Sequence, residues 1–229
     1  MYAAIKHIFF DLDDTLWDFE KNSSLVMVKL YSEHGLEKKL NATFEEFKTA
    51  YIKLNKEFWK KYNHGIIDKQ HLRNHRFNET FKLFSYDNYE ENLVITDKYL
   101  KQAPYGKHLV PGCIETLEHL QKKYRLHIIT NGFSEIQDIK LDGNDLRKYF
   151  SQIIISEDHG INKPNEKIFR IAESLAGAKK EECLMIGDSF ESDIEGATNA
   201  GWQSIHFSME AVNNSTKRIE KLHQLLDLL

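Results

Sequence analysis

The sequence predicts an α/β protein in which a doubly wound parallel sheet of the Rossmann-like class carries an inserted α-helical cap domain. Two observations lead to this prediction. Short apolar runs without apolar/polar alternation recur along the 229-residue chain, and segments with helical periodicity separate them. The gap between the first two runs is also far longer than a single crossover helix requires.

Five apolar runs are expected to form buried strands, because strands covered on both faces are continuously apolar. They are residues 5–12, 126–130, 153–156, 183–187 and 204–207. Amphipathic helices are expected between them, from apolar stripes at helical spacing. The stripes are Ile114, Leu117, Leu120 and Tyr124, then Ile168, Ile171, Ala172 and Leu175, and finally Leu222, Leu225, Leu226 and Leu229. The last stripe predicts a helix that docks on the sheet.

The long gap after the first strand is expected to hold a separate helical domain. Aromatic and leucine side chains recur there at steps of three and four, namely Phe44, Phe47, Tyr51, Leu54 and Phe58, and then Phe77, Phe81 and Phe84. We therefore assign residues 1–17 and 105–229 to the α/β core and residues 18–104 to the cap.

Composition excludes several classes of function. A net charge of −4 with interspersed signs offers no basic stripe, so a nucleic-acid polymer is not an expected partner. There is no apolar run of about 18 residues that could span a membrane, and residues 5–10 are too short for a signal peptide. A cytoplasmic location is expected. The two cysteines, Cys113 and Cys183, form no metal-type cluster and should be reduced.

Polar residues that follow the predicted strands carry the chemistry, because ligands of open α/β sheets bind beyond the carboxyl ends of the strands. The residues concerned are Asp11, Asp13 and Asp14 after the first strand, Thr130, Asn131 and Gly132 after the second, Lys163 after the third, and Asp188 with Asp193 after the fourth. Three carboxylates within four positions repel one another unless a cation lies between them. With oxygen donors and no nearby histidine or cysteine, Mg²⁺ is the expected metal.

Asp11 and Asp13 would face one reaction centre if the first strand continued through them. Asp11 could then attack phosphorus, and Asp13 could act as general acid and base. The alternative is that this cluster only caps a helix. Asp188 and Asp193 have the same alternative, Lys163 could be a solvated surface lysine, and Thr130 could be an ordinary strand-to-turn junction.

These residues, in this order, resemble the motifs of the haloacid dehalogenase-like hydrolase superfamily. Its phosphatases carry DxDxT, a strand-end Thr or Ser, a lysine, and GDxxxxD. Here these stand at residues 11–15, Thr130, Lys163 and residues 187–193. Residues 129–137 (ITNGFSEIQ), 154–169 and 186–201 further resemble the pyrimidine 5'-nucleotidase branch. Dehalogenases of the superfamily usually lack an acid at the position of Asp13, so its presence favours phosphoryl chemistry.

The resemblance implies a role for each matching residue. Asp11 would be the nucleophile and Asp13 the general acid and base. Mg²⁺ would be held by the carboxylates of Asp11 and Asp188 and by the backbone carbonyl of Asp13. Thr130, Asn131 and Lys163 would bind the phosphoryl group, Asp193 would support the site from behind, and the cap would close over the substrate.

The expected function is that of a magnesium-dependent phosphatase acting on a small phosphorylated metabolite, such as a nucleoside monophosphate. A phosphomutase of sugar phosphates is an alternative, because it can use the same pair of aspartates but returns the phosphate to its substrate. A non-catalytic binding protein on the same fold is a second alternative, of a different class.

Overall fold

The computed structural model describes residues 2–209 and 217–229 of the chain. It divides into two compact units, Met1–Phe19 with Lys107–Leu229, and Glu20–Gly106. Each junction lies two residues later than in the assignment made from the sequence. No helix in the described ranges is both long enough and apolar enough to cross a bilayer.

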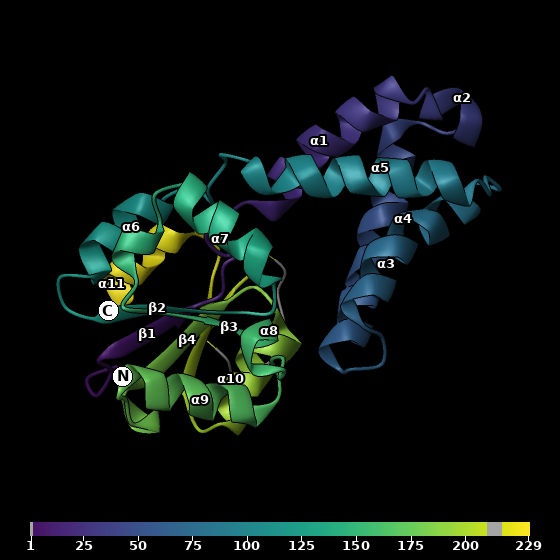
Figure 1. The fold of residues 1–229 in the computed structure, drawn as a ribbon. Helices are drawn as coiled ribbons and strands as arrows, with labels where there is room; N and C mark the ends of the chain where they lie inside the picture. The colour runs from purple at the N-terminus through teal and green to yellow at the C-terminus, as the bar shows by residue number, and fades with distance from the viewer. Residues whose placement is uncertain (1, 210–216) are drawn as a thin grey trace. The chain divides into compact units, whose positions relative to one another are not determined.

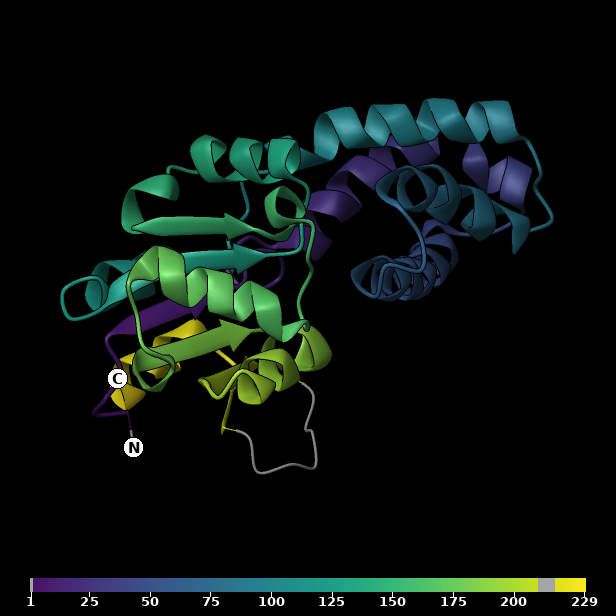
Figure 2. The same cartoon turned by 60° about the horizontal axis from the view of Figure 1, so that its bottom comes forward.

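The first unit is built on a six-stranded sheet with the order β3-β2-β1-β4-β5-β6 (Figure 1). All neighbouring strands are parallel, which confirms the predicted fold class. Figure 2 shows the strand arrows of this unit running in one direction. The strands are β1 (His7–Phe10), β2 (Arg125–Thr130), β3 (Gln152–Ile155), β4 (Cys183–Gly187), β5 (Gln203–Phe207) and β6 (Lys217–Ile219).

Two features of the sheet differ from the prediction. β1 ends at Phe10 rather than at residue 12, because the next residues form a turn in which the amides of Leu16 and Trp17 bond the carbonyl of Leu12 at 3.0 and 2.9 Å. β6 was not predicted. It has three residues, Lys-Arg-Ile, and pairs only with β5 in the sheet order, so it needs no continuous apolar run.

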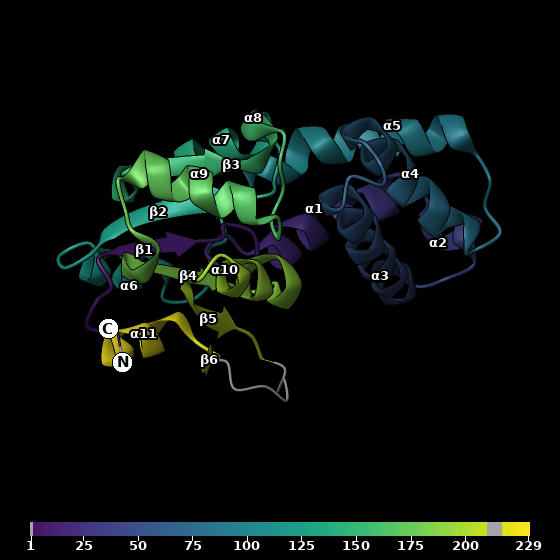
Figure 3. The ribbon, with the colours of Figure 1, turned by 90° about the horizontal axis from the view of Figure 1, so that it is seen from below.

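Helices cover both faces of the sheet, as doubly wound topology requires (Figures 1 and 3). α6 (Cys113–Leu120), α7 (Ser134–Gly143) and α11 (Leu225–Leu228) lie on one face, and α8 (Ser156–His159), α9 (Glu166–Ala176) and α10 (Gly196–Asn199) lie on the other. Ile8 and Phe10 pack into the hydrophobic cluster between the sheet and α6, α7 and α11, which we call the first cluster. Phe9 packs into the second cluster, between the sheet and α9 and α10, so the side chains of β1 alternate as in a pleated strand. Ser156 begins α8 and does not extend β3.

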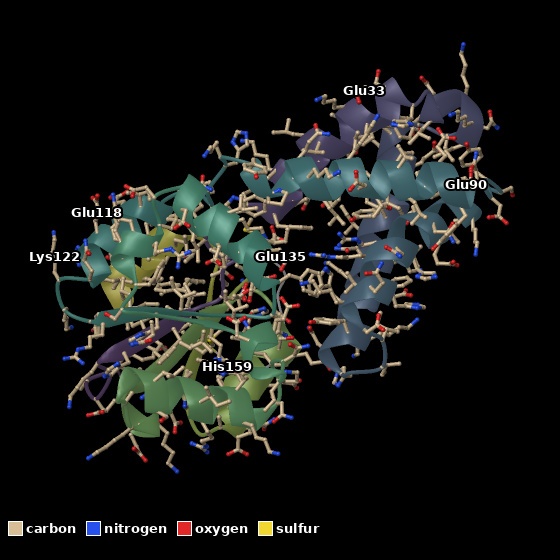
Figure 4. The ribbon with its side chains drawn as sticks, in the orientation of Figure 1. Glu33, Glu90, Glu118, Lys122, Glu135 and His159 are labelled. Carbon is tan, nitrogen blue, oxygen red and sulfur yellow. The ribbon has the colours of Figure 1, made fainter. Side chains whose placement is uncertain are left out.

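Short helical turns complete this unit. They are η2 (Arg147–Tyr149), η3 (Lys180–Glu182), η4 (Phe190–Glu195, a π-helical turn) and η5 (Leu222–Gln224). The expected final helix is split between η5 and α11, and it docks as predicted because Leu222 and Leu225 are fully buried in the first cluster. Glu118 and Lys122, near the end of α6, project away from the sheet (Figure 4).

The second unit is helical, as predicted. It contains α1 (Phe19–Glu33), α2 (Leu36–Leu40), α3 (Phe44–Asn63), α4 (Lys69–Lys82), α5 (Tyr89–Gln102) and η1 (Ala103–Tyr105). Phe47, Tyr51, Phe77 and Phe81 are buried in its own core. Thr43 and Glu46 form a capping box that fixes the start of α3.

Candidate active site

The register of the central strands brings the predicted site residues together at one edge of the sheet. Phe10, the last residue of β1, pairs with Ile128 of β2 and with Ile186 of β4. Asp11 therefore lies beside the final residues of both neighbouring strands, and its amide still bonds the carbonyl of Ile186 at 2.9 Å. Thr130 ends β2 and Asp188 directly follows β4.

Lys163 is the centre of a buried ionic network. Its Nζ lies 2.7 Å from Oδ1 of Asp11, 2.6 Å from Oδ1 of Asp193 and 2.7 Å from the carbonyl oxygen of Ile129. These three acceptors match the three hydrogens of an ammonium group. The Lys163 side chain is 1% exposed, so the interpretation as a solvated surface lysine is wrong. The helix that follows Lys163 begins at Glu166, and Asn165 is its N-cap.

Asp193 reaches this network because β4 ends in glycine. A Cβ atom on Gly187 would lie 2.2 Å from Oδ2 of Asp193, far inside van der Waals contact. The same Oδ2 accepts a hydrogen bond of 3.0 Å from the amide of Ser189. The spacing of the GDxxxxD motif therefore has a local cause, since the glycine makes room for the second aspartate.

Asp188 is held by Thr15, the last residue of the first motif. The Thr15 hydroxyl donates to Oδ1 of Asp188 at 3.3 Å and accepts from the Asp188 amide at 3.1 Å. Ser189, and not Asp188, is the N-cap of η4. Likewise, no helix begins within residues 11–15, because α1 starts at Phe19. The helix-cap alternatives for Asp11 and Asp188 are therefore wrong.

The carboxylates fit a cation of the magnesium type. One oxygen each from Asp11, Asp188 and Asp193 lies within 4.8 Å of the others. Burial raises the pKa of Asp11 to about 7 against the opposing effect of Lys163, with Asp193 acting in the same direction as burial. Burial, and then the charges of Asp11 and Asp193, raises the pKa of Asp188 well above its usual range. A nearby positive charge stabilises the ionised form of such carboxylates, and their oxygens are hard donors that suit Mg²⁺.

Thr130 is prepared to donate its hydroxyl hydrogen. The hydroxyl oxygen accepts from the amide of Gly132 at 3.1 Å and from Nε2 of Gln137 at 2.7 Å. With both acceptor positions used, the single hydrogen can be donated to a third atom, such as a phosphoryl oxygen.

The side chain of Asn131 holds the segment that carries Lys163. Its Oδ1 accepts from the Lys163 amide at 2.9 Å and from the Ser156 hydroxyl at 2.7 Å, and its Nδ2 donates to the Lys163 carbonyl at 2.8 Å. Any contact of Asn131 with a phosphoryl group would therefore come from its backbone.

Asp13 is placed differently from the expectation of a continuing strand. The chain turns after Leu12, with Asp14 in the left-handed region at φ 56°. The Asp13 carboxylate contacts Lys140 and Gln137, both on α7. Neither residue was assigned a role from the sequence, although Gln137 is the last residue of the segment 129–137. The available signal was their position three apart in the helix that follows Thr130, which places them on one face near a strand end.

Comparison with known proteins adds an independent finding. A model of the family described as haloacid dehalogenase-like hydrolase matches residues 5–201. The chain is 32% identical to the pyrimidine 5'-nucleotidase PynA of Streptococcus pneumoniae, over 98% of this chain and 94% of that protein. It is 33% identical to the pyrimidine 5'-nucleotidase YjjG of Escherichia coli, over 97% and 96% respectively.

The fold also has a similar solved structure. The HAD-hydrolase YfnB of Bacillus subtilis, in a crystal form bound to magnesium, superposes with a TM-score of 0.89. It is 27% identical in sequence, and the match covers 98% of each chain.

Proposed function

The chain belongs to the haloacid dehalogenase-like hydrolase family, and we propose that it is a magnesium-dependent phosphatase of small phosphate monoesters that forms a covalent aspartyl phosphate at Asp11. One observation carries the proposal. Nζ of the buried Lys163 lies within 2.7 Å of Oδ1 of Asp11 and of Oδ1 of Asp193. This contact lies at the carboxyl ends of the strands, where Thr130 ends β2 and Asp188 follows β4. Nucleoside monophosphates of pyrimidines are the proposed substrates, because two nucleotidases named for them are about a third identical over nearly the full chain.

In the first half of the reaction, a carboxylate oxygen of Asp11 attacks phosphorus and the bond from phosphorus to the ester oxygen breaks. Asp13 gives a proton to that departing oxygen. The ammonium of Lys163 offsets charge on the phosphoryl oxygens, and the Thr130 hydroxyl donates to one of them. The first product is the alcohol.

In the second half, Asp13 is a carboxylate and takes a proton from water as the water oxygen attacks phosphorus. The bond between phosphorus and Asp11 breaks, which releases inorganic phosphate and restores the Asp11 carboxylate. Asp11, Asp188 and the backbone carbonyl of Asp13 would hold Mg²⁺, whose positive charge favours ionised Asp11 and stabilises the charge on the phosphoryl group.

The test is phosphate release by the purified chain with Mg²⁺ over nucleoside monophosphates, sugar phosphates and phosphoglycolate. Asp11→Asn keeps the size of the side chain but removes the nucleophile, so release should fall to background. Asp97→Asn, on an exposed carboxylate of α5, is the matched control and should retain full activity. Full activity of Asp11→Asn would exclude it as nucleophile, and no preference for pyrimidine nucleotides would refute the proposed substrate class.

The same panel separates the alternatives. A phosphomutase would return an isomerised sugar phosphate in place of free phosphate. A binding protein without turnover would release nothing from any ester while its melting temperature still responded to ligand.

A further inference from the structure

The carboxyl group of Asp13 lies against two side chains of α7, Gln137 and Lys140, to which the motifs DxDxT, strand-end Thr, lysine and GDxxxxD assign no role. Nζ of Lys140 is 2.6 Å from Oδ1 and 2.9 Å from Oδ2, and Nε2 of Gln137 is 3.0 Å from Oδ2. Residues three apart share a helix face, so α7 presents both donors together. With both oxygens engaged, the carboxyl group has little freedom to rotate.

Lys140 is itself held from two sides. Its side chain is 5% exposed, and a buried ammonium is costly without an ionic partner. Asp13 supplies that partner. The rings of Trp17 and Phe19, at 4.6 and 5.9 Å from Nζ, supply cation–π contacts from the segment that follows Asp13. Turning the ammonium to solvent would lose both sets of contacts.

Gln137 connects Asp13 with Thr130. Its Nε2 donates to Oδ2 of Asp13 at 3.0 Å and to the Thr130 hydroxyl at 2.7 Å, which uses both amide hydrogens. Gly132 makes this possible, because a Cβ atom there would lie 2.0 Å from Nε2. One buried amide thus fixes the spacing between the residue proposed to protonate the ester oxygen and a residue proposed to bind the phosphoryl group.

We propose that Lys140 and Gln137 are positioning residues that hold the Asp13 carboxyl for proton transfer to the departing oxygen, and so let the enzyme expel strongly basic alkoxides. The inference rests on the proposed phosphatase function. In this step the phosphorus–oxygen bond breaks, its electron pair stays on the ester oxygen, and the proton of Asp13 forms the new O–H bond. Lys140 and Gln137 give up no proton.

Substrates with different leaving groups isolate this role. The alkoxide of a nucleoside is strongly basic and needs the proton, whereas p-nitrophenolate is weakly basic and departs without it. A residue that acts through Asp13 should therefore matter for nucleoside monophosphates and matter little for p-nitrophenyl phosphate. A residue needed only for folding or for phosphate binding should affect both substrates alike.

The experiment measures kcat for both substrates in Lys140→Met, Gln137→Met and the control Lys122→Met, whose lysine is exposed near the end of α6. General acid catalysis contributes at least about 100-fold, so Lys140→Met should lose about that much with the nucleotide. It should lose less than about fivefold with p-nitrophenyl phosphate. Gln137→Met should show the same split, and Lys122→Met should show none. In an Asp13→Asn background, Lys140→Met should add no further loss with the nucleotide.

Each other outcome has a definite meaning. Equal losses on both substrates in Lys140→Met and Gln137→Met, or no loss on either, overturn the positioning role. Additive losses in the Asp13→Asn background overturn it as well. If Lys140→Met does not fold, Gln137→Met decides by its own split. A wild-type chain that hydrolyses neither ester overturns the proposed phosphatase function, which is a different result from a variant that loses both activities equally.

Discussion

A single methyl group added at Gly187 should disrupt the site by displacing Asp193, which contacts Lys163. In Gly187→Ala the new Cβ would lie 2.2 Å from Oδ2 of Asp193, whereas ordinary van der Waals contact begins at 3.4 Å. Asp193 must therefore move by about 1 Å. It is 1% exposed, and its carboxylate accepts from Lys163 Nζ at 2.6 Å and from the Ser189 amide at 3.0 Å. A displacement of that size breaks at least one of these hydrogen bonds.

The expected magnitude follows from these contacts. Overpacking of a filled interior costs about 1–3 kcal/mol, and for a chain of this length each kcal/mol lowers the melting temperature by about 2–4 °C. Loss of a residue that supports a site from behind reduces activity by about 10- to 100-fold. Both effects should appear in Gly187→Ala.

The assay combines thermal unfolding with phosphate release. Gly143→Ala is the matched control, because its new Cβ would meet only the flexible end of Lys107 at 3.3 Å. It should keep both stability and activity. Unchanged melting temperature and rate in Gly187→Ala would show that Asp193 is not pressed against the glycine, and would refute the reasoning.

Two further predictions concern ionisable groups. Removal of Mg²⁺ with a chelator should abolish phosphate release and lower the melting temperature of the wild type, whereas Asp188→Asn should show a much smaller thermal response to Mg²⁺; equal responses would exclude Asp188 as a ligand. Burial, and then His7 and Arg125, lower the pKa of His127 to about 4 from 6.5. As the pH falls, the unfolded chain therefore takes up a proton at this histidine before the folded chain does. The contribution of neutral His127 to the free energy of unfolding is complete above pH 6.5 and is lost as the pH falls to 4, by about 3 kcal/mol at most. His127→Gln should remove that slope, as measured by urea unfolding at several pH values. The raised pKa values of Asp11 and Asp188 change the stability with the opposite sign, but they do so in the wild type and in His127→Gln alike. The test is therefore the difference between the two curves of unfolding free energy against pH. Superimposable curves would contradict the role of His127.

Much of the fold could be predicted because buried parallel strands appear in the sequence as short apolar runs. The runs that became β1 to β5 are mostly apolar and lack apolar/polar alternation, since helices cover both faces of the sheet. β6 does not appear as an apolar run, because three residues at the edge of a sheet need little burial. The end of β1 was also missed, because the turn after Leu12 depends on hydrogen bonds from Leu16 and Trp17 that no periodicity reveals.

The sequence by itself determined which polar residues follow the central strands, although the end of β1 was predicted two residues too late. The topology of a parallel α/β sheet gathers those ends at one edge, so the order of Asp11, Thr130 and Asp188 along the chain was enough to place them. What only the tertiary structure decided is which side chains meet. Lys163 contacts Asp11 across 152 positions, and Lys140 contacts Asp13 across 127. Such pairings depend on how the helices pack and how far each side chain reaches. Neither hydrophobic periodicity nor local propensity predicts these two properties.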